Sequence, residues 1–184
     1  KKTVEAMSHY KRAVEIHPGY TDAHYNLGIA LAVQHRYAEA VKSYLEALRL
    51  QEDYVEVRLR LAEALSRIGK LDEAIAHFEK LLETRPDDVE VLNNYALALM
   101  QKKRVAEAIE LYNKALAINP ESFEVLNNLG SALAEQNQLD LAIGHLKKAA
   151  SLNPEFVKTH YNLGGILIRA GRVYEGIEYY EKAL

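Results

Sequence analysis

The sequence contains no cysteine and no tryptophan, and only four prolines among its 184 residues. Without cysteine the chain can form no disulfide framework, no thiolate nucleophile and no cysteine-ligated zinc site. The lack of cysteine also favours a reducing compartment such as the cytoplasm over an oxidising one, and otherwise leaves the localisation open.

Long apolar segments and a strong charge of one sign are missing as well. No stretch approaches the roughly 20 apolar residues of a membrane-spanning helix, so membrane insertion is not expected. The formal net charge of -3 lacks the positive balance of a protein that neutralises many phosphates, so nucleic acid is not an expected partner. The 49% of hydrophobic residues and 27% of charged residues are instead typical of a soluble folded domain.

Motifs for catalysis, cofactors and metals are equally scarce. The chain has no glycine-rich phosphate-binding motif, no HExxH pair and no EF-hand loop. His9, His77 and His145 lie 68 residues apart, too far along a helical array to share a metal whose bonds are about 2 Å long. The sequence therefore predicts no enzyme, no cofactor and no metal site within these residues.

The prolines mark a period of 34 residues. Pro86, Pro120 and Pro154 follow one another at that spacing, and Pro18 lies two periods before Pro86, with Glu52 at the missing position. The phased repeats cover residues 21–54, 55–88, 89–122 and 123–156, followed by a truncated fifth repeat at 157–184 and preceded at 1–20 by the orphan second helix of an earlier repeat. Residues 1–184 are thus predicted to form a single array.

The first half of each repeat carries one helical pattern. In the first repeat, Leu27 and Leu31 are four residues apart and lie on one face, beside the small residue Gly28. Equivalent large and small residues recur in every later repeat without an insertion. Small residues at such positions let two helices approach closely, so the pattern predicts a helix that packs against a neighbour.

The second half carries another helical stripe, represented by Tyr44 and Ala47. Between the two patterns, Gly69, Asn137 and Gly171 suit the left-handed conformation that ends a helix, whereas His35 and Lys103 fit it less comfortably. Proline cannot continue a helix interior and so closes each unit. Each repeat is therefore predicted to be an antiparallel helical hairpin, and the chain an all-α solenoid of about eleven helices.

This pattern resembles the tetratricopeptide repeat family, most closely at HYNLG, residues 24–28, and NNLG, residues 127–130. The tryptophan of the family is absent, and its offset holds His24, Arg58, Leu92, Leu126 and His160. The resemblance implies a right-handed superhelix whose first helices line a concave groove for extended peptides. The implied groove residues are Tyr25, Asn26, Arg60, Arg67, Asn93, Asn94, Gln101, Asn127, Asn128, Tyr161 and Asn162.

Asparagine recurs at one offset of this groove, as Asn26, Asn94, Asn128 and Asn162, with Arg60 in the second repeat. Asparagine is a mediocre helix former, so its recurrence within helices needs a cause. Its amide could pair with the backbone of an extended ligand, or it could bond the neighbouring repeat and set the superhelical pitch. The ladder is similar to that of O-linked N-acetylglucosamine transferases, which holds substrate chains.

The sequence thus predicts a protein-interaction scaffold that binds an extended peptide or protein segment in the concave groove. One alternative is the substrate-recruiting region of a larger glycosyltransferase. Another is a self-assembling structural scaffold, because neither end of the chain supplies the polar capping helix that solenoids normally need, and exposed apolar ends could associate.

Overall fold

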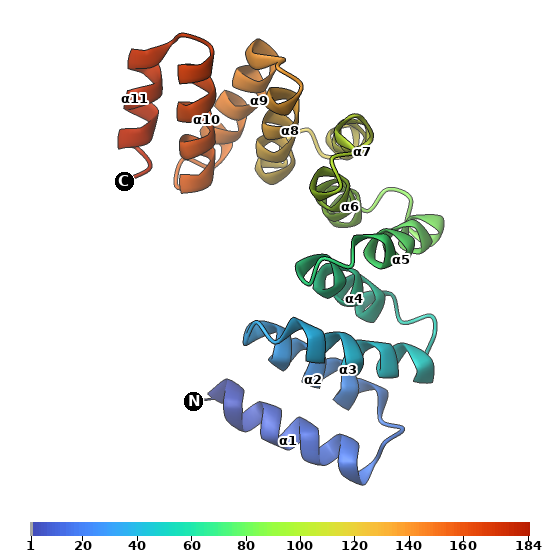
Figure 1. Cartoon of the computed structure of the whole chain (residues 1–184). Coiled ribbons are helices and arrows are strands. Elements are labelled where there is room, and N and C mark those ends of the chain that lie inside the picture. Colours follow the sequence, from blue (N-terminus) through green and yellow to red (C-terminus); the bar gives the residue numbers. More distant parts are fainter. Residues whose placement is uncertain (1) are drawn as a thin grey trace. The chain divides into compact units, whose positions relative to one another are not determined.

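The computed structural model describes residues 2–184, and this range contains eleven α-helices and no strand (Figure 1). They are α1 (Lys2–Ile16), α2 (Thr21–Val33), α3 (Tyr37–Leu50), α4 (Val55–Arg67), α5 (Leu71–Thr84), α6 (Val89–Gln101), α7 (Val105–Ile118), α8 (Phe123–Glu135), α9 (Leu139–Leu152), α10 (Val157–Arg169) and α11 (Val173–Glu181). From α2 to α10 the even-numbered helices begin 34 residues apart. The predicted all-α fold of about eleven helices is confirmed.

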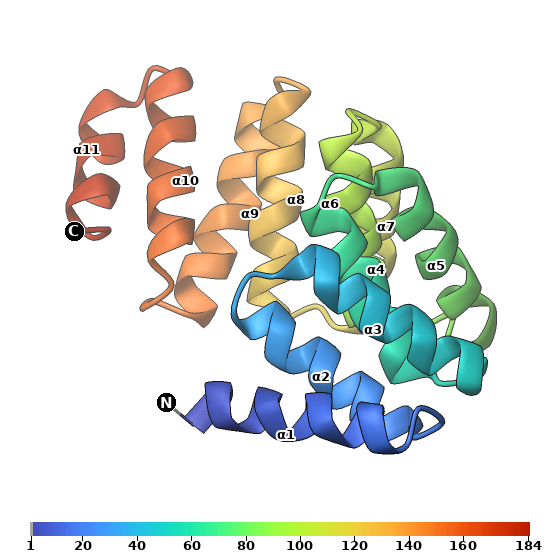
Figure 2. The same ribbon diagram turned by 60° about the horizontal axis from the view of Figure 1, so that its bottom comes forward.

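The helices form two compact units, one of α1–α5 up to Pro86 and one of α6–α11 in Asp87–Leu184. Within the first unit, α2 pairs with α3 and α4 with α5. Within the second, the pairs are α6 with α7, α8 with α9, and α10 with α11, each pair lying side by side in Figures 1 and 2. The odd-numbered helix of a pair also packs against the next even-numbered helix of its unit, so each hairpin covers the apolar face of its neighbour.

The core of each hairpin joins a small residue of the first helix to a large residue of the second. A Cβ atom built on Gly130 in α8 would lie 2.6 Å from Cγ of Leu146 in α9, so no larger residue fits there. Tyr44, Phe78, Tyr112 and Leu146 are each at most 1% exposed. Burying one such side chain stabilises the fold by about 1.5–3 kcal/mol, which explains why the large and small residues recur together.

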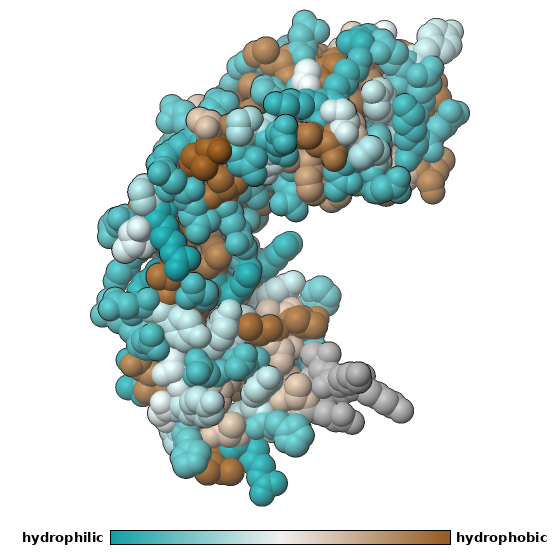
Figure 3. Space-filling view, turned by 180° about the vertical axis from the view of Figure 1, so that it is seen from behind, coloured by the Kyte–Doolittle hydropathy of each residue, from teal (hydrophilic) through white to brown (hydrophobic). Residues whose placement is uncertain are grey.

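The surface contrasts with this core. The face seen in Figure 3 is mostly hydrophilic over each unit, and its apolar residues form small, separate patches. A contiguous exposed apolar patch of several hundred Å² would mark a docking face. On this face, candidate sites therefore have to be sought where polar side chains are arranged by the helices.

A residue with positive φ ends the first helix of every hairpin. His35, Gly69, Lys103, Asn137 and Gly171 have φ values of 58°, 79°, 62°, 60° and 79°. Glycine and asparagine tolerate this region, whereas a side chain such as that of lysine is strained there. The left-handed conformation expected at these five positions is confirmed, and the poorer fit of His35 and Lys103 stays a prediction.

Lys103→Gly is expected to raise the free energy of unfolding by about 0.5–1 kcal/mol, because relief of left-handed strain outweighs the added freedom of glycine in the unfolded chain. Urea denaturation followed by circular dichroism measures the change. Asn137→Gly is the matched control and should change stability less, because asparagine already tolerates the conformation. Equal effects of the two substitutions would show that strain at Lys103 is not the cause.

Candidate functional site

The predicted groove residues lie on the first helices of the hairpins. In the first unit Tyr25 and Asn26 belong to α2, and Arg60 and Arg67 to α4; in the second unit Asn93, Asn94 and Gln101 belong to α6, Asn127 and Asn128 to α8, and Tyr161 and Asn162 to α10. The two sets have different chemistry. The second unit carries most of the amides, and the first unit carries the two arginines.

Hydrogen bonds between amides connect the first helices of the second unit. Asn128 donates from Nδ2 to Oδ1 of Asn93 over 2.9 Å, which joins α8 to α6. Asn162 donates in the same way to Oδ1 of Asn127 over 3.0 Å, which joins α10 to α8. Asn127 in turn donates to Oδ1 of Asn128 over 3.3 Å, so the two bridges form one connected network. In this unit the asparagines do bond neighbouring hairpins.

Asn127 lies at the centre of this network, and the position of its side chain differs from the predicted one. Its side chain was predicted to line the groove, but it is only 1% exposed. Its Oδ1 also accepts a 3.3 Å hydrogen bond from the hydroxyl of Thr159, which is fully buried. Because its offset turns toward the next hairpin, Asn127 holds helices together through these hydrogen bonds. Thr159 was missed, since a single threonine in a first helical turn stands out in no sequence pattern.

The amides next to Asn127 keep hydrogen-bonding capacity. Asn162 uses both N–H groups, toward Asn127 and toward Oγ of Ser131 at 3.2 Å, while within the described residues its Oδ1 accepts no hydrogen bond. Asn128 has a second N–H beyond the one given to Asn93. Both side chains are only half-buried. The second unit therefore offers an acceptor and a donor that are held in fixed positions.

A pocket of about 270 Å³ adjoins these amides. Ser131 and Ala134 line it from α8, Tyr161, Asn162 and Arg169 from α10, and Tyr180 from α11. Tyr161 is 62% exposed, and its ring lies 5.3 Å from that of Tyr180. Arg169 is anchored by a 2.8 Å hydrogen bond to the carbonyl oxygen of Ala134. The pocket thus combines an aromatic wall, a cation and the amide of Asn162.

The first unit is built differently because Tyr25 stands at the offset of Asn93 and Asn127. The ring of Tyr25 packs against those of Tyr54, at 5.4 Å, and Tyr44, at 6.3 Å. Burial raises the pKa of Tyr44 well above its usual range, so the phenol stays neutral. Arg60 forms a 2.8 Å ion pair with Glu63 on its own helix, and Arg67 is exposed. This surface is aromatic and charged, and its described residues form no amide-to-amide bridge like those of the second unit.

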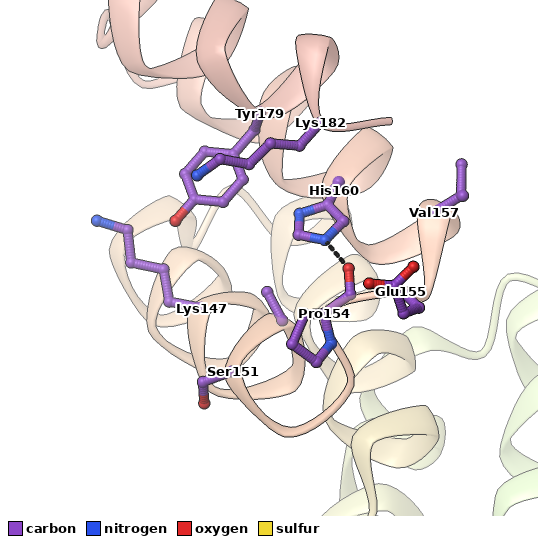
Figure 4. Close-up of a pocket in the computed structure, with 9 residues that line it drawn as sticks. Lys147, Ser151, Pro154, Glu155, Val157, His160, Tyr179 and Lys182 are labelled. Atoms are coloured by element: carbon purple, nitrogen blue, oxygen red, sulfur yellow. Dashed lines mark hydrogen bonds between the residues drawn. The ribbon is translucent and has the colours of Figure 1, made fainter. Parts of the chain in front are cut away.

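Polar side chains at the offset where the family has tryptophan form hydrogen bonds to the preceding turn. Nε2 of His160 donates to the carbonyl oxygen of Pro154 over 2.6 Å (Figure 4). Nε2 of His24 makes the same bond to the carbonyl oxygen of Pro18 over 2.8 Å. Arg58 makes the equivalent 2.6 Å bond to the carbonyl oxygen of Glu52. Each polar substitute thereby satisfies a carbonyl in the turn that enters its helix, a role that sequence reasoning missed.

The Arg58 guanidinium also lies 3.4 Å from Nδ1 of His77 on α5. Burial and, secondly, this positive charge lower the pKa of His77, so its imidazole is neutral at pH 7. A neutral Nδ1 can accept from the guanidinium. Since the folded pKa lies below the unfolded one, this contact favours the folded state above about pH 6.5 and is lost as the pH falls below it.

Metal and membrane sites have no counterpart in the described structure. Among residues 2–184, no three His, Asp or Glu side chains gather closely enough to hold a metal ion. No helix in the part of the chain that the structure describes combines the length and the apolar character needed to cross a membrane.

Comparisons with known proteins agree with the hairpin architecture. Family models described as tetratricopeptide repeat match residues 19–87, 59–123 and 111–144, and a model described as TPR repeat matches residues 130–171. No curated protein matches the chain.

Several solved structures share the fold. MamA 41-end from Desulfovibrio magneticus RS-1 aligns with a TM-score of 0.77 at 23% identity, over 89% of this chain and 92% of its own. MamA MSR-1 C2 aligns with a TM-score of 0.69 at 28% identity, over 89% and 94%. YrrB, described as a TPR protein with an unusual peptide-binding site, aligns with a TM-score of 0.68 at 19% identity, over 95% and 90%. With its helical hairpins at a period of 34 residues, the chain is an all-α solenoid and belongs to the tetratricopeptide repeat family.

Proposed function

We propose that this protein is an interaction scaffold that binds an extended segment of another protein along the first helices of its hairpins. The observation that carries the proposal is the amide network of α6, α8 and α10, which leaves the Asn162 carbonyl and one Asn128 N–H for a ligand. The relation to YrrB, a TPR protein with a peptide-binding site, supports a binding role. Binding by a scaffold also agrees with a sequence that carries no catalytic motif.

The chemistry of these amides suits a peptide backbone. An extended peptide presents alternating N–H and C=O groups that find few internal partners. Asn162 offers an acceptor for a peptide N–H, and Asn128 offers a donor for a peptide carbonyl. Because both side chains are fixed by bonds to their neighbours, binding costs them little rotamer entropy. We propose that Asn26 and Asn94 act at the equivalent offset of their own helices.

Side-chain preference comes from the residues beside the amides. In the second unit the pocket beside Asn162 would receive one ligand side chain against Tyr161, with Arg169 at its edge. Gln101 adds an exposed amide at the end of α6. In the first unit Tyr25, Arg60 and Arg67 would set a different preference. Three ideas stay predictions. They are that the two units act as one continuous array, that the chain recruits substrates for a glycosyltransferase, and that it assembles with other copies of itself.

To test this proposal, a peptide that binds the whole chain is first selected from a random displayed library. Tyr161→Ala is expected to weaken that peptide about tenfold in fluorescence anisotropy, because an exposed aromatic side chain that a ligand buries contributes on the order of 1–2 kcal/mol. Tyr174→Ala is the matched control, since Tyr174 is 88% exposed on α11 and lies outside the proposed surface.

The asparagine offset is tested with the same peptide. Asn94→Ala and Asn128→Ala together should weaken binding at least tenfold while circular dichroism shows the helices intact. If all these variants bind as the unchanged chain does, or if no peptide is selected, the proposed groove is wrong.

A further inference from the structure

A second cavity, of about 530 Å³, lies in the second unit and shares no residue with the proposed groove (Figure 4). We call it the α9–α11 pocket. Lys147 and Ser151 line it from the last turns of α9, His160 from the start of α10, and Tyr179 from α11; Lys182 follows the end of α11. Pro154 forms part of its floor in the connection between α9 and α10.

Of the two ammonium groups of this pocket, one shares its carboxylate with an arginine and the other has no acidic partner among residues 2–184. Lys147 lies 3.6 Å from the carboxylate of Glu175, and that carboxylate is already bound by Arg172 at 2.6 Å. Lys182 stands over the ring of Tyr179, 4.6 Å from its centre, and pairs with no carboxylate among residues 2–184. Figure 4 shows both lysine side chains ending on the same side of the pocket as the Tyr179 hydroxyl. The two ammonium groups and the Tyr179 hydroxyl are therefore three hydrogen-bond donors on one side of the α9–α11 pocket.

The equivalent positions of the first unit show what balances this lysine elsewhere. Lys80 has the same repeat offset as Lys182, and its Nζ is 2.7 Å from Oε1 of Glu52. Glu52 stands at the offset of Pro154, which has no carboxylate. The last hairpin thus keeps the lysine but lacks the internal anion that neutralises it in the first unit.

The residue at the offset of His160 also differs between these two hairpins. In the hairpin of α4 and α5, the offset of His160 holds Arg58, whose long side chain is 8% exposed and reaches His77. Histidine is shorter than arginine, and its Nε2–H is already given to Pro154. In the last hairpin the shorter His160 lines the cavity together with Lys182, which pairs with no carboxylate among residues 2–184.

We infer that the α9–α11 pocket binds an anionic group, a carboxylate or a phosphate, between Lys147 and Lys182. The anion takes the place that the Glu52 carboxylate has beside Lys80. The ammonium groups supply charge-assisted hydrogen bonds, which are the stronger class, and the Tyr179 hydroxyl supplies a neutral donor. Glu155 also lines the pocket, and its negative charge opposes the anion, so the pocket selects a small anionic group and not a polyanion.

Titration of the whole ¹⁵N-labelled chain tests the inference, with inorganic phosphate and acetate as separate probes and sodium chloride holding the ionic strength constant. Saturable shifts of the amide signals of Ser151, His160 and Tyr179 are expected with at least one probe. Lys147→Gln or Lys182→Gln should each weaken that binding by roughly tenfold. Lys114→Gln is the matched control, because Lys114 has the offset of Lys182 two repeats earlier and does not line the pocket.

The two probes separate the sources of the anion. Saturation by acetate points to an acidic side chain or chain end of a partner protein, and saturation by phosphate alone points to a phosphorylated group. Glu155→Gln should tighten the binding of either probe, because it removes the opposing negative charge. Shifts that do not saturate, that chloride reproduces, or that persist in both lysine variants while their thermal midpoints are unchanged would overturn the inference.

Discussion

Asn127→Ala is expected to lower the free energy of unfolding by about 2–4 kcal/mol, because the substitution leaves several polar groups at a buried position without partners. Thr159 would lose its acceptor, Asn162 would lose the acceptor that joins α10 to α8, and Asn128 would lose a donor. The side chain of Asn127 is 1% exposed, so water cannot readily replace these bonds. Urea unfolding followed at 222 nm measures the loss.

Gln101→Ala provides the control for Asn127→Ala. Gln101 is an exposed amide at the end of α6, so its removal should change stability by less than about 0.5 kcal/mol. Thr159→Val should be much milder in the Asn127→Ala background than alone, since both substitutions remove the same bond. A loss for Asn127→Ala no larger than that for Gln101→Ala would contradict the role of the network.

Gly164→Ala should also destabilise the protein, by about 1–3 kcal/mol. A Cβ atom at Gly164 would lie 2.9 Å from the carbonyl oxygen of Gly176 and 3.0 Å from the ring of Tyr180. The first of these neighbours is backbone, so α10 and α11 would have to move apart. The overpacking outweighs the gain of up to about 1 kcal/mol that alanine brings to a helix interior.

Gly144→Ala is the matched control for this substitution. Gly144 also lies inside a helix, α9, but nothing stands within 4 Å of a Cβ built there. It should therefore stabilise the protein by up to about 1 kcal/mol through helix propensity alone. Thermal unfolding of both variants gives the comparison, and equal shifts in the same direction would rule out a close contact between Gly164 and Gly176.

Much of the fold could be predicted from the sequence because the same weak indication recurs at the same offset in every repeat. One glycine after a helix says little, but the five positions from His35 to Gly171 at one offset predicted five left-handed residues. The paired apolar stripes likewise predicted the helices, since burial of Tyr44 or Phe78 depends on a local spacing that the sequence displays directly.

The details of the candidate site could not be predicted in the same way. Asn127 and Asn128 are neighbours with identical side chains, yet one is buried and the other is half-exposed. That difference depends on how far α8 is rotated toward α10, which is a tertiary property. The α9–α11 pocket was missed for a related reason: the sequence shows that His160 stands in the family's tryptophan offset, but not whether its neighbours close the remaining space.

The amide bridges between hairpins also have a direction. In both bridges the later hairpin donates, from Asn128 to Asn93 and from Asn162 to Asn127, so a hairpin needs both asparagines to be linked on either side. The hairpin of α10 has Tyr161 where an accepting asparagine would stand, and can only donate. The hairpin of α10 therefore has to come last in such a series, and a chain in which it preceded another hairpin would keep its helices but lose one amide bridge.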